Sequence, residues 1–277
     1  YHTPYSQLKL SPSLLQRLSL IEPSKACYLP QTNPYLVSQL ELLPPAQHQP
    51  FAQRFYHQQD LTLWFKPDTE FQTPKGHIFV QLTLPNTIKD LSALALTKLW
   101  LELVLDDINE QFYPATTAGL HYNLYVQQHG LTLHCSGLSG NQIGLMSDIL
   151  RQLPLRQFQQ HRFVELQRQL IQHWQNNGRN KPVSRMFSQL SALLQPLHPE
   201  PQKLAQLLQQ TSFNDFSQFC EQMFQQVHIE SLMLGNWMQE DADTLAIQLQ
   251  SWLKQLKSPG QPLKRQSYNT RGLGPVW

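Results

Sequence analysis

The apolar residues of this 277-residue chain change their spacing near Gly140, and that change constrains the fold more than any other sequence feature. Before Gly140, apolar positions alternate with polar ones in several segments, as at Leu61, Leu63 and Phe65. After it, apolar residues recur about every 3.6 positions over most of the remaining chain. Period two is typical of a strand with one buried face, and a period near 3.6 is typical of an amphipathic helix. Strands that mostly precede helices predict an α+β fold.

The same patterns place the individual elements. We expect strands at 61–66, 78–84 and 227–234, and a β-hairpin at 120–135 that turns at Gly130. We expect helices at 91–112, 141–152, 156–176, 182–195, 201–209, 213–225 and 240–256, with a short helical pattern around 14–20. The helix at 91–112 is apolar around more than half of its circumference, which predicts burial on most sides. Together these elements predict a mostly antiparallel sheet with the helices packed on one face.

Proline marks the two ends of the chain. Eight of the twenty prolines lie in the first fifty residues, where they remove hydrogen-bond donors and fix φ. We therefore predict an extended connector over 1–58, a domain over 59–257, and a second connector over 258–277, which is rich in proline and glycine. The chain begins at Tyr1 with neither methionine nor a leader, so we expect it to be a piece of a longer or processed protein.

Composition excludes two classes of partner. The net charge of +2 is spread over scattered basic residues, whereas nucleic-acid binding needs a concentrated basic face. The richest apolar stretch, 91–105, is interrupted by Lys98 and Glu102 and falls short of the ~18–20 residues that cross a bilayer. We therefore predict a soluble protein that binds neither nucleic acid nor membrane.

The three cysteines, Cys27, Cys135 and Cys220, are too few and too widely spaced for a disulfide framework or a CxxC metal site. We expect buried thiols. One disulfide in an oxidising compartment is the alternative, and the sequence does not choose the pair.

The eleven histidines give no helical zinc motif. Zinc peptidases need two imidazoles three or four residues apart on one helix, with a carboxylate nearby. No two histidines here have that spacing, so HExxH and HxxEH are both absent. A ligand set that uses His121 and His134, both on the polar face of the hairpin, is an alternative to two ordinary surface histidines. His161 and Glu165 are interpreted as a solvated i, i+4 pair, with a catalytic dyad as the alternative.

Other catalytic and binding patterns are incomplete. The segment Gly137–Gly140 lacks the full GxSxG pattern, and Ser139 or Asn141 is better interpreted as a helix cap. Asp106 and Asp107 diverge by about 100° on their helix, which predicts places on its wet edge rather than a catalytic pair. P-loop and GxGxxG motifs are absent. We predict no catalytic, cofactor-binding or metal-binding residue in this chain.

Several passages resemble the third domain of the pitrilysin/insulin-degrading enzyme (insulinase) family of metallopeptidases. They are Leu63–Asp68 with Phe71 and Pro74–Lys75; Leu101–Leu124 with Asp107, Tyr113, Ala115, Ala118–Leu120 and Tyr122; His228–Leu232 with Gly235–Asn236; and Tyr28–Pro30 with Asn33. The order and spacing agree over nearly the whole chain, and Arg271–Gly272 resembles the entry into the next domain.

The resemblance implies a fold shared with the mitochondrial processing peptidases, in which four homologous domains pair into two bowls that close around a peptide. It implies that zinc is held by HxxEH in the first domain of the parent protein and that the third domain is a degenerate copy without metal. The helix at 91–112 is similar in place to the motif helix but has no histidine. The implied partners are the other domains of the polypeptide and the enclosed peptide. Bacterial members are often periplasmic, which is the compartment that the resemblance suggests.

The leading hypothesis is therefore a non-catalytic domain of a zinc-dependent metalloendopeptidase that forms part of a peptide-enclosing chamber. One alternative is a stand-alone scaffold subunit with the same fold and no peptidase activity. Another is an unrelated hydrolase that uses a metal held by the hairpin histidines.

Overall fold

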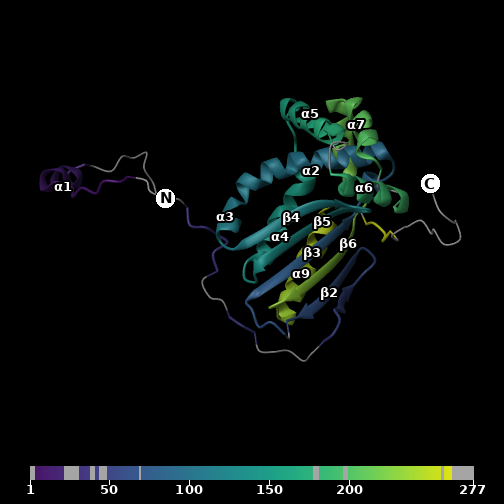
Figure 1. Ribbon diagram of the computed structural model, residues 1–277. Helices are drawn as coiled ribbons and strands as arrows, with labels where there is room; N and C mark the ends of the chain where they lie inside the picture. The colour runs from purple at the N-terminus through teal and green to yellow at the C-terminus, as the bar shows by residue number, and fades with distance from the viewer. Residues whose placement is uncertain are drawn as a thin grey trace. The chain divides into compact units, whose positions relative to one another are not determined.

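The computed structural model describes residues 4–21, 31–37, 41–43, 49–68, 70–176, 181–195, 199–256 and 259–263 (Figure 1). The chain forms two compact units, 1–33 and 34–277. Cys27, the passage Tyr28–Pro30 and the tail passage Arg271–Gly272 lie outside the described residues. None of the helices within the described ranges is both long enough and apolar enough to cross a bilayer.

The first unit contains helix α1 (Pro12–Ser19). The hydroxyl of Ser11 accepts a hydrogen bond from the N–H of Leu14 and so satisfies one of the free donors at the start of the helix. Pro12 at the first helical position fixes a helical φ at no cost in hydrogen bonds. The short helical pattern predicted around 14–20 corresponds to this helix.

The second unit contains one six-stranded sheet with the order β1-β2-β6-β3-β5-β4. The strands are β1 (Gln53–His57), β2 (Leu61–Pro67), β3 (Lys75–Thr83), β4 (Leu120–Gln127), β5 (Gly130–Leu138) and β6 (His228–Gly235). All neighbouring pairs are antiparallel except β2 and β6, which are parallel. The late strand β6 therefore enters the middle of the sheet, and the sequence analysis missed the edge strand β1.

The helices of this unit follow the predicted pattern closely. They are α2 (Leu91–Gln111), α3 (Tyr113–Thr117), α4 (Gln142–Gln152), α5 (Gln160–Asn176), α6 (Pro182–Leu194), α7 (Pro201–Gln209), α8 (Phe213–Met223) and α9 (Gln239–Leu256), with 3₁₀ turns η1 (Pro85–Thr87) and η2 (Leu153–Leu155). The start of α2 is fixed by Asp90, whose carboxylate accepts the N–H of Ala93 at 2.7 Å. Helix α5 begins four residues later than the predicted 156.

The core lies between the sheet and its helices. Helix α4 contacts β5, α9 contacts β2 and α4, and α2 contacts β4, while α5, α7 and α8 pack against α2. Figure 1 shows α4 and α9 behind the strands. In β3, Ile78, Val80 and Leu82 are fully buried, while the alternate residues His77 and Phe79 are only partly buried. Their side chains belong to the other face of the sheet, which we call the open face.

Candidate functional site

Helix α2 does not carry the donor set of a zinc-binding peptidase helix. It contains no histidine, and its ten buried positions are apolar except for Thr97. The Thr97 hydroxyl donates to the carbonyl oxygen of Ala93 at 2.8 Å, which ties it to its own helix. Burial lowers the pKa of Lys98, and the nearby Glu102 opposes that shift. These residues do not fit a zinc ion, which needs nitrogen, sulfur or carboxylate ligands that converge.

The two hairpin histidines lie on the open face but have different surroundings. His121 is exposed on β4, in register with Ser136 of β5. The Nε2 atom of His134 lies 3.1 Å from Nδ1 of His77, so these two rings share a hydrogen bond across β5 and β3. Within the described ranges, no group of three or more His, Cys, Asp or Glu side chains is placed to hold a metal.

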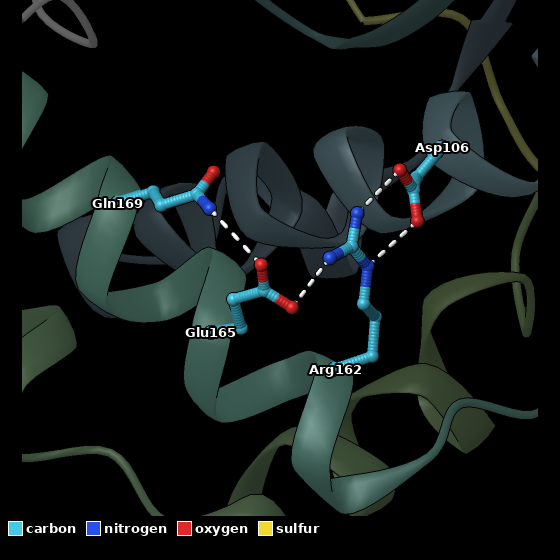
Figure 2. Close-up of polar contacts among 4 residues, drawn as sticks. All are labelled: Asp106, Arg162, Glu165 and Gln169. Carbon is cyan, nitrogen blue, oxygen red and sulfur yellow. Dashed lines mark hydrogen bonds and ion pairs between the residues drawn. The ribbon is translucent and has the colours of Figure 1, made fainter.

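The carboxylate of Glu165 interacts with residues other than His161. Figure 2 shows Arg162 of α5 between Asp106 of α2 and Glu165, with Gln169 donating to the other oxygen of Glu165. The Nε and Nη2 atoms of Arg162 lie 2.7 and 2.6 Å from the two carboxylate oxygens of Asp106. This two-pronged contact lowers the pKa of Asp106. The ion pairs of Arg162 join helix α2 to helix α5 and have a structural role. Glu165 pairs with Arg162 and not, as predicted, with His161.

Asp106 and Asp107 have separate partners, which confirms that they diverge. Asp107 accepts a hydrogen bond from Nη1 of Arg156 at 3.1 Å, whereas Asp106 pairs with Arg162. The two carboxylate side chains are 38% and 41% exposed, as expected on the wet edge of α2.

The junction between β5 and α4 is held by side chains that bond to other segments. Asn141 occupies the N-cap position of α4, as predicted, but makes no capping hydrogen bond. Its Nδ2 atom instead donates to the carbonyl oxygens of Pro34 and Leu36 at 3.3 Å each. The buried Ser139 accepts a hydrogen bond from Nδ2 of Asn236 at 3.2 Å. Neither residue is arranged as a nucleophile.

The two described cysteines are free thiols. Cys135 is fully buried in β5, and Cys220 is partly buried in α8. Burial raises the pKa of Cys220 to about 12 and raises that of Cys135 strongly. Both are therefore protonated and unreactive at neutral pH.

The open face carries an ordered row of side chains across all six strands. In register from β1 to β4, the row consists of Arg54, Trp64, Leu232, Phe79, His134 and Asn123. The four central members are partly exposed and carry no carboxylate or lysine. The neighbouring row, Thr62, Glu230, Gln81, Thr132 and Tyr125, is polar. The face therefore offers an apolar strip with hydrogen-bonding groups beside it.

Aromatic rings give the strip its rigidity. The rings of Phe79 and His134 are 4.0 Å apart with planes at 4°, and the ring of His77 is stacked on that of His134 at 5.3 Å. Burial, and then the charge of His77, lower the pKa of His134, so its imidazole is neutral at pH 7. On the other side of Phe79, the indole N–H of Trp64 donates to Glu230 at 3.0 Å. These contacts fix the orientation of the side chains before any ligand binds.

A pocket of about 280 Å³ opens at one end of this face, where β2 and β6 finish and β3 begins. Its walls include Lys66, Asp68, Phe71, His77, Leu234 and Gly235. Three of these residues, Lys66, Leu234 and His77, are aligned in register as the next row of the open face. The pocket is thus continuous with the face. Sequence analysis did not find it, although the motif Leu63–Asp68 with Phe71 pointed to the right segment.

Comparison with known proteins now identifies the fold. A model described as the middle or third domain of peptidase M16 matches residues 1–207. The chain belongs to this family. The resemblance to the insulinase third domain is therefore confirmed.

Relatives of this M16 middle domain are much longer proteins. Insulin-degrading enzyme-like 1, peroxisomal, from Arabidopsis thaliana is 24% identical over 246 residues, which is 88% of this chain and 25% of the relative. Human insulin-degrading enzyme is 24% identical over 237 residues, 85% of this chain and 23% of the relative. The chain spans about a quarter of the length of these proteins.

Solved structures show the same fold. The crystal structure of pitrilysin aligns with a TM-score of 0.76 and 16% identity over 86% of this chain and 25% of the pitrilysin chain. A peptidase M16 inactive domain from Pseudomonas fluorescens aligns with a TM-score of 0.55 and 13% identity over 79% of this chain and 54% of that one. The predicted α+β fold is confirmed.

Proposed function

We propose that this M16 middle domain is a non-catalytic part of a zinc-dependent metalloendopeptidase like pitrilysin and insulin-degrading enzyme. In this proposal its open face forms part of the wall of a peptide-enclosing chamber. The zinc would be held by another domain of the same polypeptide, because α2 has no histidine. The length of the relatives, about four times that of this chain, supports a parent with further domains.

The observation that carries the proposal is the open face itself. It combines an apolar row, from Trp64 to His134, with polar side chains such as Gln81 in the next row. An unfolded peptide presents apolar side chains together with backbone donors and acceptors, and such a face can receive both. Because the row has few charges, it selects weakly among sequences, which suits a wall that must accept many peptides.

The catalytic part of the proposal is tested with a quenched fluorescent peptide. The 277-residue chain should give no turnover with or without added zinc. Metal-dependent cleavage by this chain alone would refute its assignment as a non-catalytic domain.

The placement of the peptide is tested by photo-crosslinking. An unstructured peptide carrying a photoreactive phenylalanine analogue should crosslink to the strands of the open face, with Trp64, Phe79 and Gln81 among the labelled positions. The exposed side of α5 serves as an internal reference. Crosslinks found on the helices and not on the open face would overturn the proposal.

A further inference from the structure

The pocket at the end of the open face is lined in part by described residues of the segment that links β2 to β3. The carboxylate of Asp68 accepts hydrogen bonds from the N–H groups of Glu70 and Phe71, both at 3.0 Å. Burial opposes ionisation of Asp68, but these and neighbouring backbone donors together lower its pKa. The carbonyl of Pro74 accepts the N–H of Ser139 at 3.0 Å, which anchors the other end of the turn.

This turn holds an aromatic side chain in solvent. Phe71 is 78% exposed, although it lies on the wall of a pocket. The next residue, Gln72, has φ 46°, a left-handed conformation that a residue with a Cβ rarely adopts. A strained turn that presents an exposed phenyl ring gives no benefit to the core. The ring therefore forms part of the pocket wall without packing into the core.

The size and charge of the pocket define what it can hold. Its volume of about 280 Å³ is at or below the lower limit for small-molecule sites, so it matches one side chain better than a cofactor. Leu234 and Phe71 supply apolar walls. Lys66 and Lys75 are balanced by Asp68 and Glu70, so the rim has no net charge that would select an ion. One uncharged apolar side chain therefore fits best.

We propose that this pocket receives one aromatic or branched apolar side chain of an extended peptide that lies across the open face. The inference rests on the proposed function, because it takes the enclosed peptide as the ligand. It adds a preference for an apolar side chain at one position of the peptide, whereas the rest of the open face accepts many peptide sequences. His77 and Leu234, which belong both to the pocket and to the open face, connect the two.

The test uses fluorescein-labelled decapeptides of glycine and serine that carry a single guest residue, Phe, Leu or Ser. Fluorescence anisotropy with the 277-residue chain should show the Phe and Leu peptides binding roughly tenfold or more tightly than the Ser peptide, as expected for burial of one apolar side chain. Equal affinities for the three peptides would refute the proposal.

Two variants locate the effect. Thr73→Trp places a large side chain on the pocket wall from an exposed position and should reduce the Phe-to-Ser ratio to near one. Phe71→Ser should reduce it by roughly threefold, the value of one aromatic contact. Tyr113→Ser removes another exposed aromatic side chain, 65% exposed and outside the pocket, and is the matched control. If both pocket variants keep the full ratio, the side chain binds elsewhere.

The outcome also separates this inference from the proposed function. Crosslinks on the open face with no guest-residue preference would support the chamber-wall proposal and refute only the proposal that the pocket binds a side chain. Crosslinks that avoid the open face would refute both proposals.

Discussion

Replacing Gln142 tests whether one buried amide holds the sheet to helix α4. Its Nε2 atom lies 2.9 Å from the carbonyl oxygens of Gly76 and Gly137 and 3.0 Å from that of Leu138. The side chain is fully buried. It therefore links the start of β3 and the end of β5 to the helix that follows, beside the strands that form the pocket.

The expected cost of Gln142→Met follows from these bonds. Methionine has a similar length but no N–H donor, so carbonyl groups lose two donated hydrogen bonds at about 1–3 kcal/mol each. The substitution also removes Oε1, a buried acceptor without a donor among the described residues. Removing it relieves the penalty of one unsatisfied buried group, which is again about 1–3 kcal/mol. The net loss is about 1–3 kcal/mol, which in a domain of this size lowers Tm by roughly 2–12 °C.

Gln142→Glu should be worse at neutral pH and should respond to acid. An ionised carboxylate donates nothing and faces three carbonyl oxygens, so the folded state raises its pKa above the ~4.3 of an unfolded chain. A group with a raised folded pKa contributes its full stability at low pH and loses it as pH rises through the folded value. The Glu variant should thus approach the Met variant between pH 7.5 and 5.

Calorimetric melting at both pH values measures these effects, and Gln159→Met, at an exposed position, is the matched control. If the Met and Glu variants both had the Tm of the native chain, the amide would have no anchoring role. A Glu variant that lost stability on acidification, relative to the native chain, would refute the account of its pKa.

Three further substitutions test separate parts of the fold. Gly235→Ala should destabilise the domain by at least about 1–3 kcal/mol in urea unfolding, since φ is 122° and the added Cβ meets neighbouring backbone. Gly144→Ala, where the added Cβ meets open space on α4, should instead stabilise the domain by up to about 1 kcal/mol. The opposite order of stabilities would contradict both assignments. His134 has a lowered folded pKa, so its contribution is present above pH 6.5 and lost as pH falls; NMR titration should place its midpoint below that of an exposed histidine, and a midpoint at or above 6.5 would be inconsistent with the buried stack. Arg162→Lys cannot keep the two-pronged contact with Asp106, so amide exchange in the first turns of α5 should rise, and unchanged exchange would show that the pair does not hold the helix.

Elements with a local signal were predicted nearly to the residue. Asp90 before an apolar run set the start of α2, and the alternation over 120–135 with its turn at Gly130 set the hairpin strands β4 and β5. Helix α5 starts late because Arg156 is extended and its guanidinium bonds to Asp107, Gln111 and Gln152 at the edge of the helical layer. A long-range contact of that kind leaves no mark in a periodic pattern.

The missing strand β1 and the open-face site were beyond sequence reasoning for a related reason. Strand β1 lies at the sheet edge, is half exposed, and has a register shift between Arg54 and Tyr56, so it lacks the alternation of a buried strand. The contact between His77 and His134 requires the register of β3 on β5, which nothing near either histidine specifies. The sequence placed His134 on the correct face but could not supply its partner.

The pocket shows how distant parts of the chain acquire a joint role. Strand β6 inserts between β2 and β3, so Gly235 comes to lie beside the turn, where its carbonyl accepts the N–H of Asp68 at 2.7 Å. Folding alone accounts for these two residues, because one caps the turn and the other permits a close approach of backbones. It does not account for Phe71, whose exposed ring can be removed at little cost to the core. A Phe71→Ser chain that melts normally but shows a roughly threefold smaller preference for apolar guests would therefore separate recognition from stability at a single residue.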